Sequence, residues 1–170
     1  MVGTHKYASG YQVPGARLTV VKVQEKTTLD IYMSYRNLEI YKESKRLAIE
    51  VHSMTLELPK FEMYEEGGQV RRSSKSVTSM IVEGYGRKRY KADYIKHLVY
   101  AQVECDETIV HLEFLFETGS GKEEDKMNTL IHEYDVLSKR INKYTQWVED
   151  NFDPGYNVKE PHLNDIEPNF

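Results

Sequence analysis

The sequence predicts an all-α protein, an antiparallel up-and-down four-helix bundle with an N-terminal extension. Three observations support this fold class. Apolar residues recur at three- and four-residue spacing in four successive stretches, which is the period of an amphipathic helix. The connections between these stretches are short, which favours antiparallel neighbours. The chain has 170 residues, a length that suits a single domain.

Residues 1–36 are predicted to form a separate N-terminal arm. The arm contains four residues that interrupt regular structure, namely Gly3, Gly10, Pro14 and Gly15. The β-branched run at residues 18–23 allows one short strand. A lone strand needs a partner, either in its own chain or in another subunit.

The first helix of the bundle is predicted to begin at Asn37, a suitable N-cap residue, and to end at Pro59. The second is predicted from Val70 to Gly84, where a glycine suits a left-handed C-cap. The glycines at 67–68 would each cost about 1 kcal/mol inside a helix. The second helix therefore either starts after them or is kinked there.

The third helix is predicted to start near Arg89 and to end before the polar stretch at residues 118–122. The fourth covers residues 126–152, and the Asp-Pro-Gly sequence at 153–155 ends it. Residues 37–152 thus make up the bundle. Residues 153–170 are expected to be a flexible acidic tail.

Several function classes are disfavoured by composition and motifs. No run reaches the roughly 18 apolar residues of a membrane span, and no apolar signal stretch opens the chain, so a cytoplasmic location is expected. The glycine-rich stretch at residues 119–122 lacks the spacing of a phosphate-binding loop. The six histidines follow no metal-binding pattern. The single cysteine, Cys105, lies on the apolar side of the third helix, which favours a packed thiol. No catalytic residue, metal or cofactor is therefore predicted.

The distribution of charge is more informative than its total of −4. Residues 71–97 carry eight cations and two carboxylates, whereas the rest of the chain has a net charge of −10. Seven cations of this window are predicted to contact phosphates: Arg71, Arg72, Lys75, Arg87, Lys88, Arg89 and Lys91. Tyr85 and Tyr90 lie among them and could stack on unpaired bases. The four cations from 87 to 91 surround a predicted helix N-terminus, where backbone N–H groups attract anions.

The alternative for this window is a solvated basic face that pairs with acidic helices, in the same subunit or across a subunit boundary. Glu83 lies within the window, near the predicted end of a helix, where a carboxylate is unfavourable without a partner. It is expected to form a structural ion pair with a nearby arginine.

Three stretches carry a family resemblance: a P-x-x-E at 59–62, a Q-V-R-R-S-S-K-S-V at 69–77 and an I-V-E-G-Y-G-R at 81–87. The sequence resembles the four-helix bundle proteins encoded by intervening sequences in bacterial 23S ribosomal RNA genes. The matching positions are Gln69, Arg71, Arg72, Ser76, Glu83, Gly84 and Arg87. The departures include Met80 in place of Asn, Ser73 in place of Ala and Glu66 in place of an apolar residue.

The resemblance implies a homo-oligomeric ring, commonly a pentamer, with a basic surface that binds nucleic acid and no known enzymatic activity. The accessory variability determinant of diversity-generating retroelements is related, which implies a reverse transcriptase as a further partner. The leading hypothesis is therefore a non-catalytic accessory protein that binds nucleic acid, RNA in preference to DNA. The alternative is a protein-interaction module that docks an enzyme such as a reverse transcriptase.

Overall fold

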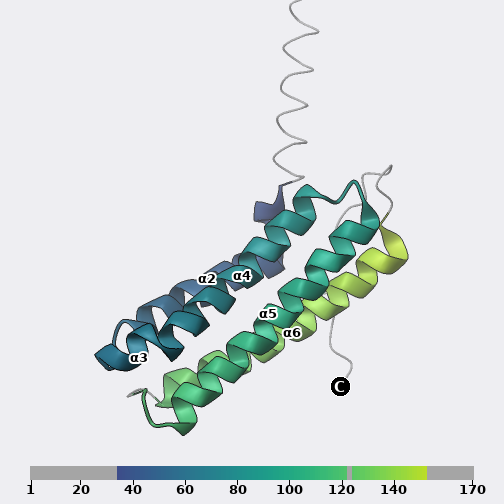
Figure 1. Cartoon of the computed structure of the whole chain (residues 1–170). Helices are drawn as coiled ribbons and strands as arrows, with labels where there is room; N and C mark the ends of the chain where they lie inside the picture. Colours follow the sequence, from purple (N-terminus) through teal and green to yellow (C-terminus); the bar gives the residue numbers. More distant parts are fainter. Residues whose placement is uncertain (1–33, 122–123, 153–170) are drawn as a thin grey trace, which may run out of the picture. The chain divides into compact units, whose positions relative to one another are not determined.

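The computed structural model describes residues 34–121 and 124–152, and every regular element within these ranges is helical. The elements in order are the 3-10 turn η1 (Tyr35–Asn37), α2 (Glu39–Thr55), α3 (Lys60–Tyr64), α4 (Glu66–Gly86), α5 (Lys91–Glu117) and α6 (Glu124–Asn151) (Figure 1). The predicted all-α four-helix bundle is confirmed. The strand allowed at residues 18–23 and the predicted tail at residues 153–170 lie outside the described residues.

The four long helices surround one hydrophobic core. α2 packs on α4 and α6, and α5 packs on the same two helices. Successive long helices run in opposite directions, as short connections require (Figure 1). The largest fully buried side chains include Tyr94, Leu112 and Tyr134. The hydroxyl groups of Tyr94 and Tyr144 share a hydrogen bond of 2.9 Å. This buried polar contact connects α5 to α6 within the apolar core.

Helix boundaries differ from the predicted ones at several points. Asn37 is not an N-cap, because it ends the 3-10 turn and Leu38 takes the cap position without a side-chain hydrogen bond. α2 already ends at Thr55. Pro59 instead caps the five-residue helix α3, which the periodicity did not predict because one turn is too short to show a period. α4 begins at Glu66 and therefore contains the 67–68 glycine pair.

Gly84 is not a left-handed cap, and this prediction was wrong. α4 continues to Gly86, and Arg87 is the C-cap residue. A Cβ atom at Gly84 would lie 2.9 Å from Cβ of His97 and 3.1 Å from Cδ2 of Tyr94 on α5. The glycine therefore allows a close approach of α4 to α5.

Substitution of this glycine should destabilise the fold, although alanine favours a helix. Gly84→Ala forces a contact that costs about 1–3 kcal/mol of overpacking, against a gain of up to about 1 kcal/mol in helix propensity. Gly68→Ala is the matched control, because no atom beyond its chain neighbours and its own helix backbone lies within 4 Å of its added Cβ. Urea denaturation should show a lower midpoint for Gly84→Ala and a higher one for Gly68→Ala. A rise for both variants would contradict the close approach at Gly84.

Candidate nucleic-acid interface

The seven predicted cations do not form one cluster. Arg72 lies near the start of α4, whereas Arg87 caps its other end, about 22 Å farther along the helix axis. The structure therefore divides the basic window into a set on α4 and a set at the α4–α5 turn.

Arg71 is directed into the molecule rather than toward solvent. Its Nη2 atom donates a hydrogen bond of 2.7 Å to the backbone oxygen of Met63 on α3. Its Nη1 atom is buried and has no hydrogen-bond partner among the described residues. A Cβ at Gly67 would lie 3.3 Å from this Nη1 atom. Arg71 thus connects α3 to α4, a role that its neighbour Arg72 does not share.

Arg72 and Lys75 are exposed on the outer side of α4. Arg72 donates a hydrogen bond of 3.0 Å to Oε1 of Gln69, which keeps its side chain on the surface. Neither cation forms an ion pair with any residue in the described ranges. Both are available to an anionic ligand.

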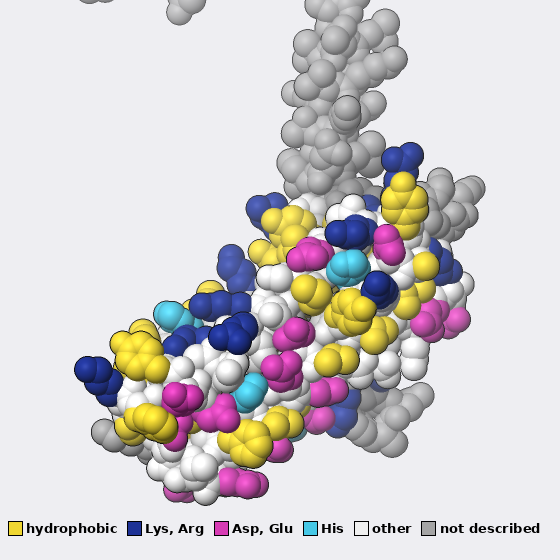
Figure 2. All heavy atoms as spheres, viewed as in Figure 1, with side chains coloured by type: hydrophobic (Ala, Val, Ile, Leu, Met, Phe, Trp, Pro, Cys, Tyr) yellow, Lys and Arg dark blue, Asp and Glu magenta, His cyan; other side chains and the backbone are white. Residues whose placement is uncertain are grey.

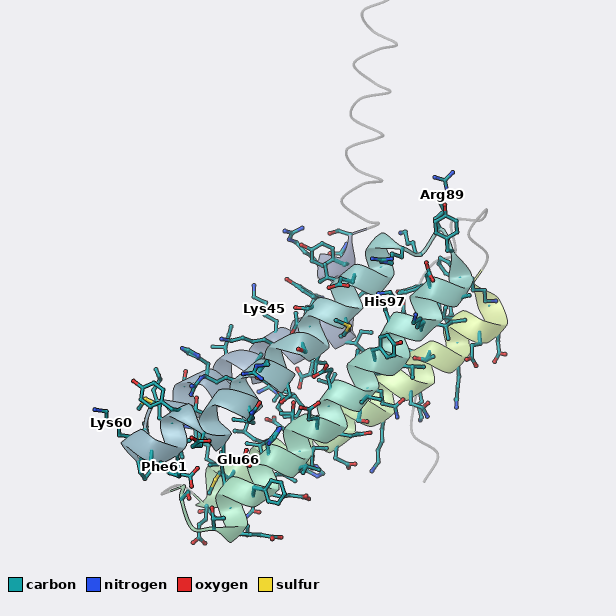
Figure 3. All side chains as sticks on the ribbon, in the orientation of Figure 1. Lys45, Lys60, Phe61, Glu66, Arg89 and His97 are labelled. Carbon is teal, nitrogen blue, oxygen red and sulfur yellow. The ribbon has the colours of Figure 1, made fainter. Side chains whose placement is uncertain are left out.

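A third exposed cation, Lys45 on α2, joins this side of the bundle and was not predicted. Thr78 on α4 donates a hydrogen bond of 3.1 Å to Ser44 on α2, so the two helices are in contact there. Lys45 is the residue that follows Ser44. Lys45 points away from the bundle (Figure 3). We call Lys45, Arg72 and Lys75 the basic face, and Figure 2 shows Lys and Arg side chains gathered over α2 and α4. Lys45 was not predicted because charge was counted by segment. Residues 36–70 carry five cations and seven carboxylates, so this segment has a net negative charge.

The carboxylates of α2 leave Lys45 unpaired because another cation takes them. Arg46 binds Glu43 at 2.6 Å and Glu50 at 2.6 Å, and reaches Glu133 on α6 at 3.0 Å. The hydrogen bond from Arg46 lowers the pKa of Glu43, and the carboxylates raise the pKa of Arg46. Negative charge on α2 is therefore concentrated on the side that faces α6.

The cations of the α4–α5 turn have different surroundings. Arg87 and Arg89 are exposed, and Arg89 projects beyond the helices (Figure 3). Lys88 lies over the ring of Tyr85 at 3.9 Å, and Lys91 donates to the backbone oxygen of Glu149 at 2.6 Å. Lys88 and Lys91 are thus partly engaged within the subunit.

The two predicted stacking tyrosines also differ. Tyr85 is half-buried and makes edge contacts with the rings of Tyr35 and Tyr94. Tyr90 is 62% exposed and is the N-cap residue of α5. Of the two rings, Tyr90 is the one with a face open to a base.

Other motif residues hold elements together. Glu83 was expected to pair with an arginine, but its carboxylate lies 3.7 Å from Nε2 of His97 on α5. Glu62, the last residue of the P-x-x-E motif, accepts a hydrogen bond of 2.9 Å from Ser120 after α5. In the middle of the bundle, Thr108 donates to Ser73 at 2.9 Å. The contacts of Glu83 and Glu62 explain these two motif positions by packing alone.

Two titratable groups of the core, the Cys105 thiol and the Tyr134 hydroxyl, are shielded from solvent. Burial raises the pKa of the Cys105 thiol, and the nearby carboxylates of Asp106 and Glu104 add to the effect. Burial likewise raises the pKa of Tyr134. Within residues 34–121 and 124–152, no three His, Cys, Asp or Glu side chains are grouped to hold a metal ion. None of the helices in these ranges is both long and apolar enough to cross a membrane.

Comparison with known families gives one match. The family model described as 23S rRNA-intervening sequence protein matches residues 36–143. The matched region includes α2 to α5 and most of α6. A search of curated proteins found no match to the chain.

Proposed function

Because the chain belongs to the 23S rRNA-intervening sequence protein family, we propose that it is a non-catalytic accessory protein that binds nucleic acid, RNA in preference to DNA. The observation that carries the proposal is the basic face, where Lys45, Arg72 and Lys75 extend from two adjacent helices without carboxylate partners in the described part of the chain. Phosphate groups are the natural ligands of such a surface. Arg87, Arg89 and the exposed ring of Tyr90 form a second contact at the α4–α5 turn.

The protein acts in this proposal as a ring-shaped homo-oligomer, with a pentamer favoured by the family resemblance. A ring repeats the basic face in every subunit, so one strand of nucleic acid can contact several faces at once. Linked contacts raise the overall affinity well above that of a single face. The contacts are to phosphates, so binding should not depend on base sequence and should weaken steeply with salt.

The experiment that tests this function reverses two cations of the basic face. In Arg72→Glu/Lys75→Glu, the affinity for single-stranded RNA should fall about 10-fold or more in low salt, similarly for all base sequences. The slope of log affinity against log salt should become shallower by about 1.4 for each subunit that engages the strand. Fluorescence anisotropy with a labelled RNA over a salt series measures both quantities.

The matched control is Lys139→Glu/Arg140→Glu, which makes the same change in net charge at exposed positions of α6. This control should keep most of the wild-type affinity. An equal loss in both double variants would show that only total charge matters, and wild-type protein that fails to bind at low salt would refute the function.

A protein partner such as a reverse transcriptase is the second candidate. The observation that favours it is the pair of aromatic side chains on α3, Phe61 and Tyr64, which are 73% and 72% exposed. Exposed aromatic residues are common anchors of protein interfaces. A partner that stays bound after nuclease treatment, and that is lost in Phe61→Ser/Tyr64→Ser, would support this candidate over nucleic-acid binding.

A further inference from the structure

The side of α5 that faces away from the core is apolar. Val99, Val103, Val110 and Phe114 are 43%, 56%, 44% and 49% exposed. Their spacing of four, seven and four residues puts them on one stripe about 22 Å long. Figure 2 shows hydrophobic side chains gathered along this helix. We call these four residues the α5 stripe.

The α5 stripe lies opposite the buried side of the same helix. The core residues of α5 include Leu98, Cys105 and Leu112, which are fully buried. α5 therefore has two apolar sides, and the described helices cover one of them. An amphipathic helix at the surface needs only one apolar side, so the second indicates a contact with another molecule.

Negative charge borders the α5 stripe. Asp106, Glu107, Glu113 and Glu117 lie along or beside it. Glu113 and Glu117 form no ion pair with any residue that the structure describes. Two copies of the stripe packed against each other would bring these carboxylates together, and like charges across an interface are unfavourable. The stripe thus requires a partner that is apolar and basic.

The outer side of α2 has this character. Ile49 and Leu56 are 57% and 55% exposed, and Lys45 and His52 alternate with them at spacings of four, three and four residues. We call these four residues the α2 ridge. Lys45 has no carboxylate partner in the described ranges, because Arg46 takes the nearby ones. The α2 ridge therefore offers apolar side chains together with an unpaired cation.

We infer that the α5 stripe of one copy of this chain packs on the α2 ridge of the next copy. The contact buries the apolar side chains of both surfaces and places Lys45 opposite the unpaired carboxylates of α5. Within the assembly, Arg72 and Lys75 on α4 are then the cations of the basic face that remain exposed to nucleic acid. Its two sides differ, so each copy keeps a free stripe and a free ridge for further copies, and the assembly closes into a ring or grows as a filament. This inference rests on the ring in the proposed function and names the surfaces that form it.

The experiment disrupts each surface separately and then combines the variants. Val103→Glu changes the stripe and Ile49→Glu changes the ridge, and each variant alone should have the mass of a monomer by sedimentation velocity. An equimolar mixture should form a heterodimer, because the intact stripe of the Ile49→Glu chain meets the intact ridge of the Val103→Glu chain. No nucleic acid is present, so the result is independent of the test of nucleic-acid binding.

Gln146→Glu, at an exposed position of α6, is the control and should keep the wild-type mass. Circular dichroism checks that each variant remains helical, and Val110→Glu replaces Val103→Glu if the latter loses helix content. Three results would each overturn the inference: a monomeric wild-type chain, a mixture that stays monomeric, or an Ile49→Glu variant with the wild-type mass. The last of these would show that the α5 stripe binds something other than the α2 ridge.

Discussion

Leu112→Ala is expected to lower the free energy of unfolding by about 2–5 kcal/mol. Leu112 is fully buried in the last third of α5, among side chains from the neighbouring helices. Its truncation leaves a cavity that rigid helices cannot close completely, so both burial and dispersion contacts are lost. Urea denaturation, at a protein concentration where the chain is monomeric, measures the change without a contribution from assembly.

Val110→Ala is the matched control for this prediction. Val110 lies two residues earlier on the α5 stripe and is 44% exposed. Its truncation should change the stability of the monomer by no more than about 0.5 kcal/mol, while weakening self-association. Similar losses of monomer stability in both variants would mean that the two sides of α5 are buried alike within one subunit.

Arg71→Ala should lower the free energy of unfolding by about 1.5–3 kcal/mol, the range for a hydrogen bond to a charged group. The physical reason is the bond from its guanidinium to the Met63 oxygen, which secures α3 against α4. Arg71→Glu should cost more, because it places a carboxylate beside a backbone oxygen that accepts hydrogen bonds. Thermal or urea unfolding of both variants measures these effects.

The neighbouring residue gives the contrast. Arg72→Ala removes an exposed side chain and should leave the unfolding free energy within about 0.5 kcal/mol of wild type. It should instead reduce affinity for RNA. If the two arginines exchanged these effects, with Arg72→Ala unfolding the protein and Arg71→Ala losing only affinity, the assigned role of Arg71 would be wrong.

The fold was predictable because helical periodicity extends over long stretches of this sequence. Four apolar patterns gave four long helices, and the polar stretch before residue 122 gave the turn where Gly119 adopts a φ of 65°. Short elements carry no such signal. The helix α3 has five residues, and its start at Pro59 resembles the end of the preceding helix in the sequence.

The prediction of a helix end at Gly84 failed for a tertiary reason. Glycine is favoured at helix ends for its φ angles, but Gly67 and Gly84 lie within α4 because a neighbouring element approaches there. Distances between elements cannot be read from one helix alone. The sequence therefore suggested a helix end at Gly84, where the structure has a close contact between α4 and α5.

The basic window at residues 71–97 was visible in the sequence. Its division into one set of cations on α4 and another at the α4–α5 turn was not. Charge counting places Arg71 and Arg72 together, but adjacent residues on a helix point about 100° apart. Arg71 therefore reaches the backbone of α3, whereas Arg72 reaches solvent. Likewise Lys45 joins the basic face only through the packing of α2 on α4, a contact between residues 34 positions apart.

The aromatic contacts of α6 supply a built-in spectroscopic probe. Trp147 is the single tryptophan of the chain, and its ring stacks on that of Tyr144 at 5.8 Å with an interplanar angle of 20°. Tyr144 in turn is joined to Tyr94 at the start of α5. Excitation of tyrosine passes to a tryptophan at such short range, so the emission of Trp147 reports on the order of this end of the bundle. Binding or melting at the α4–α5 turn can therefore be followed optically without an attached label.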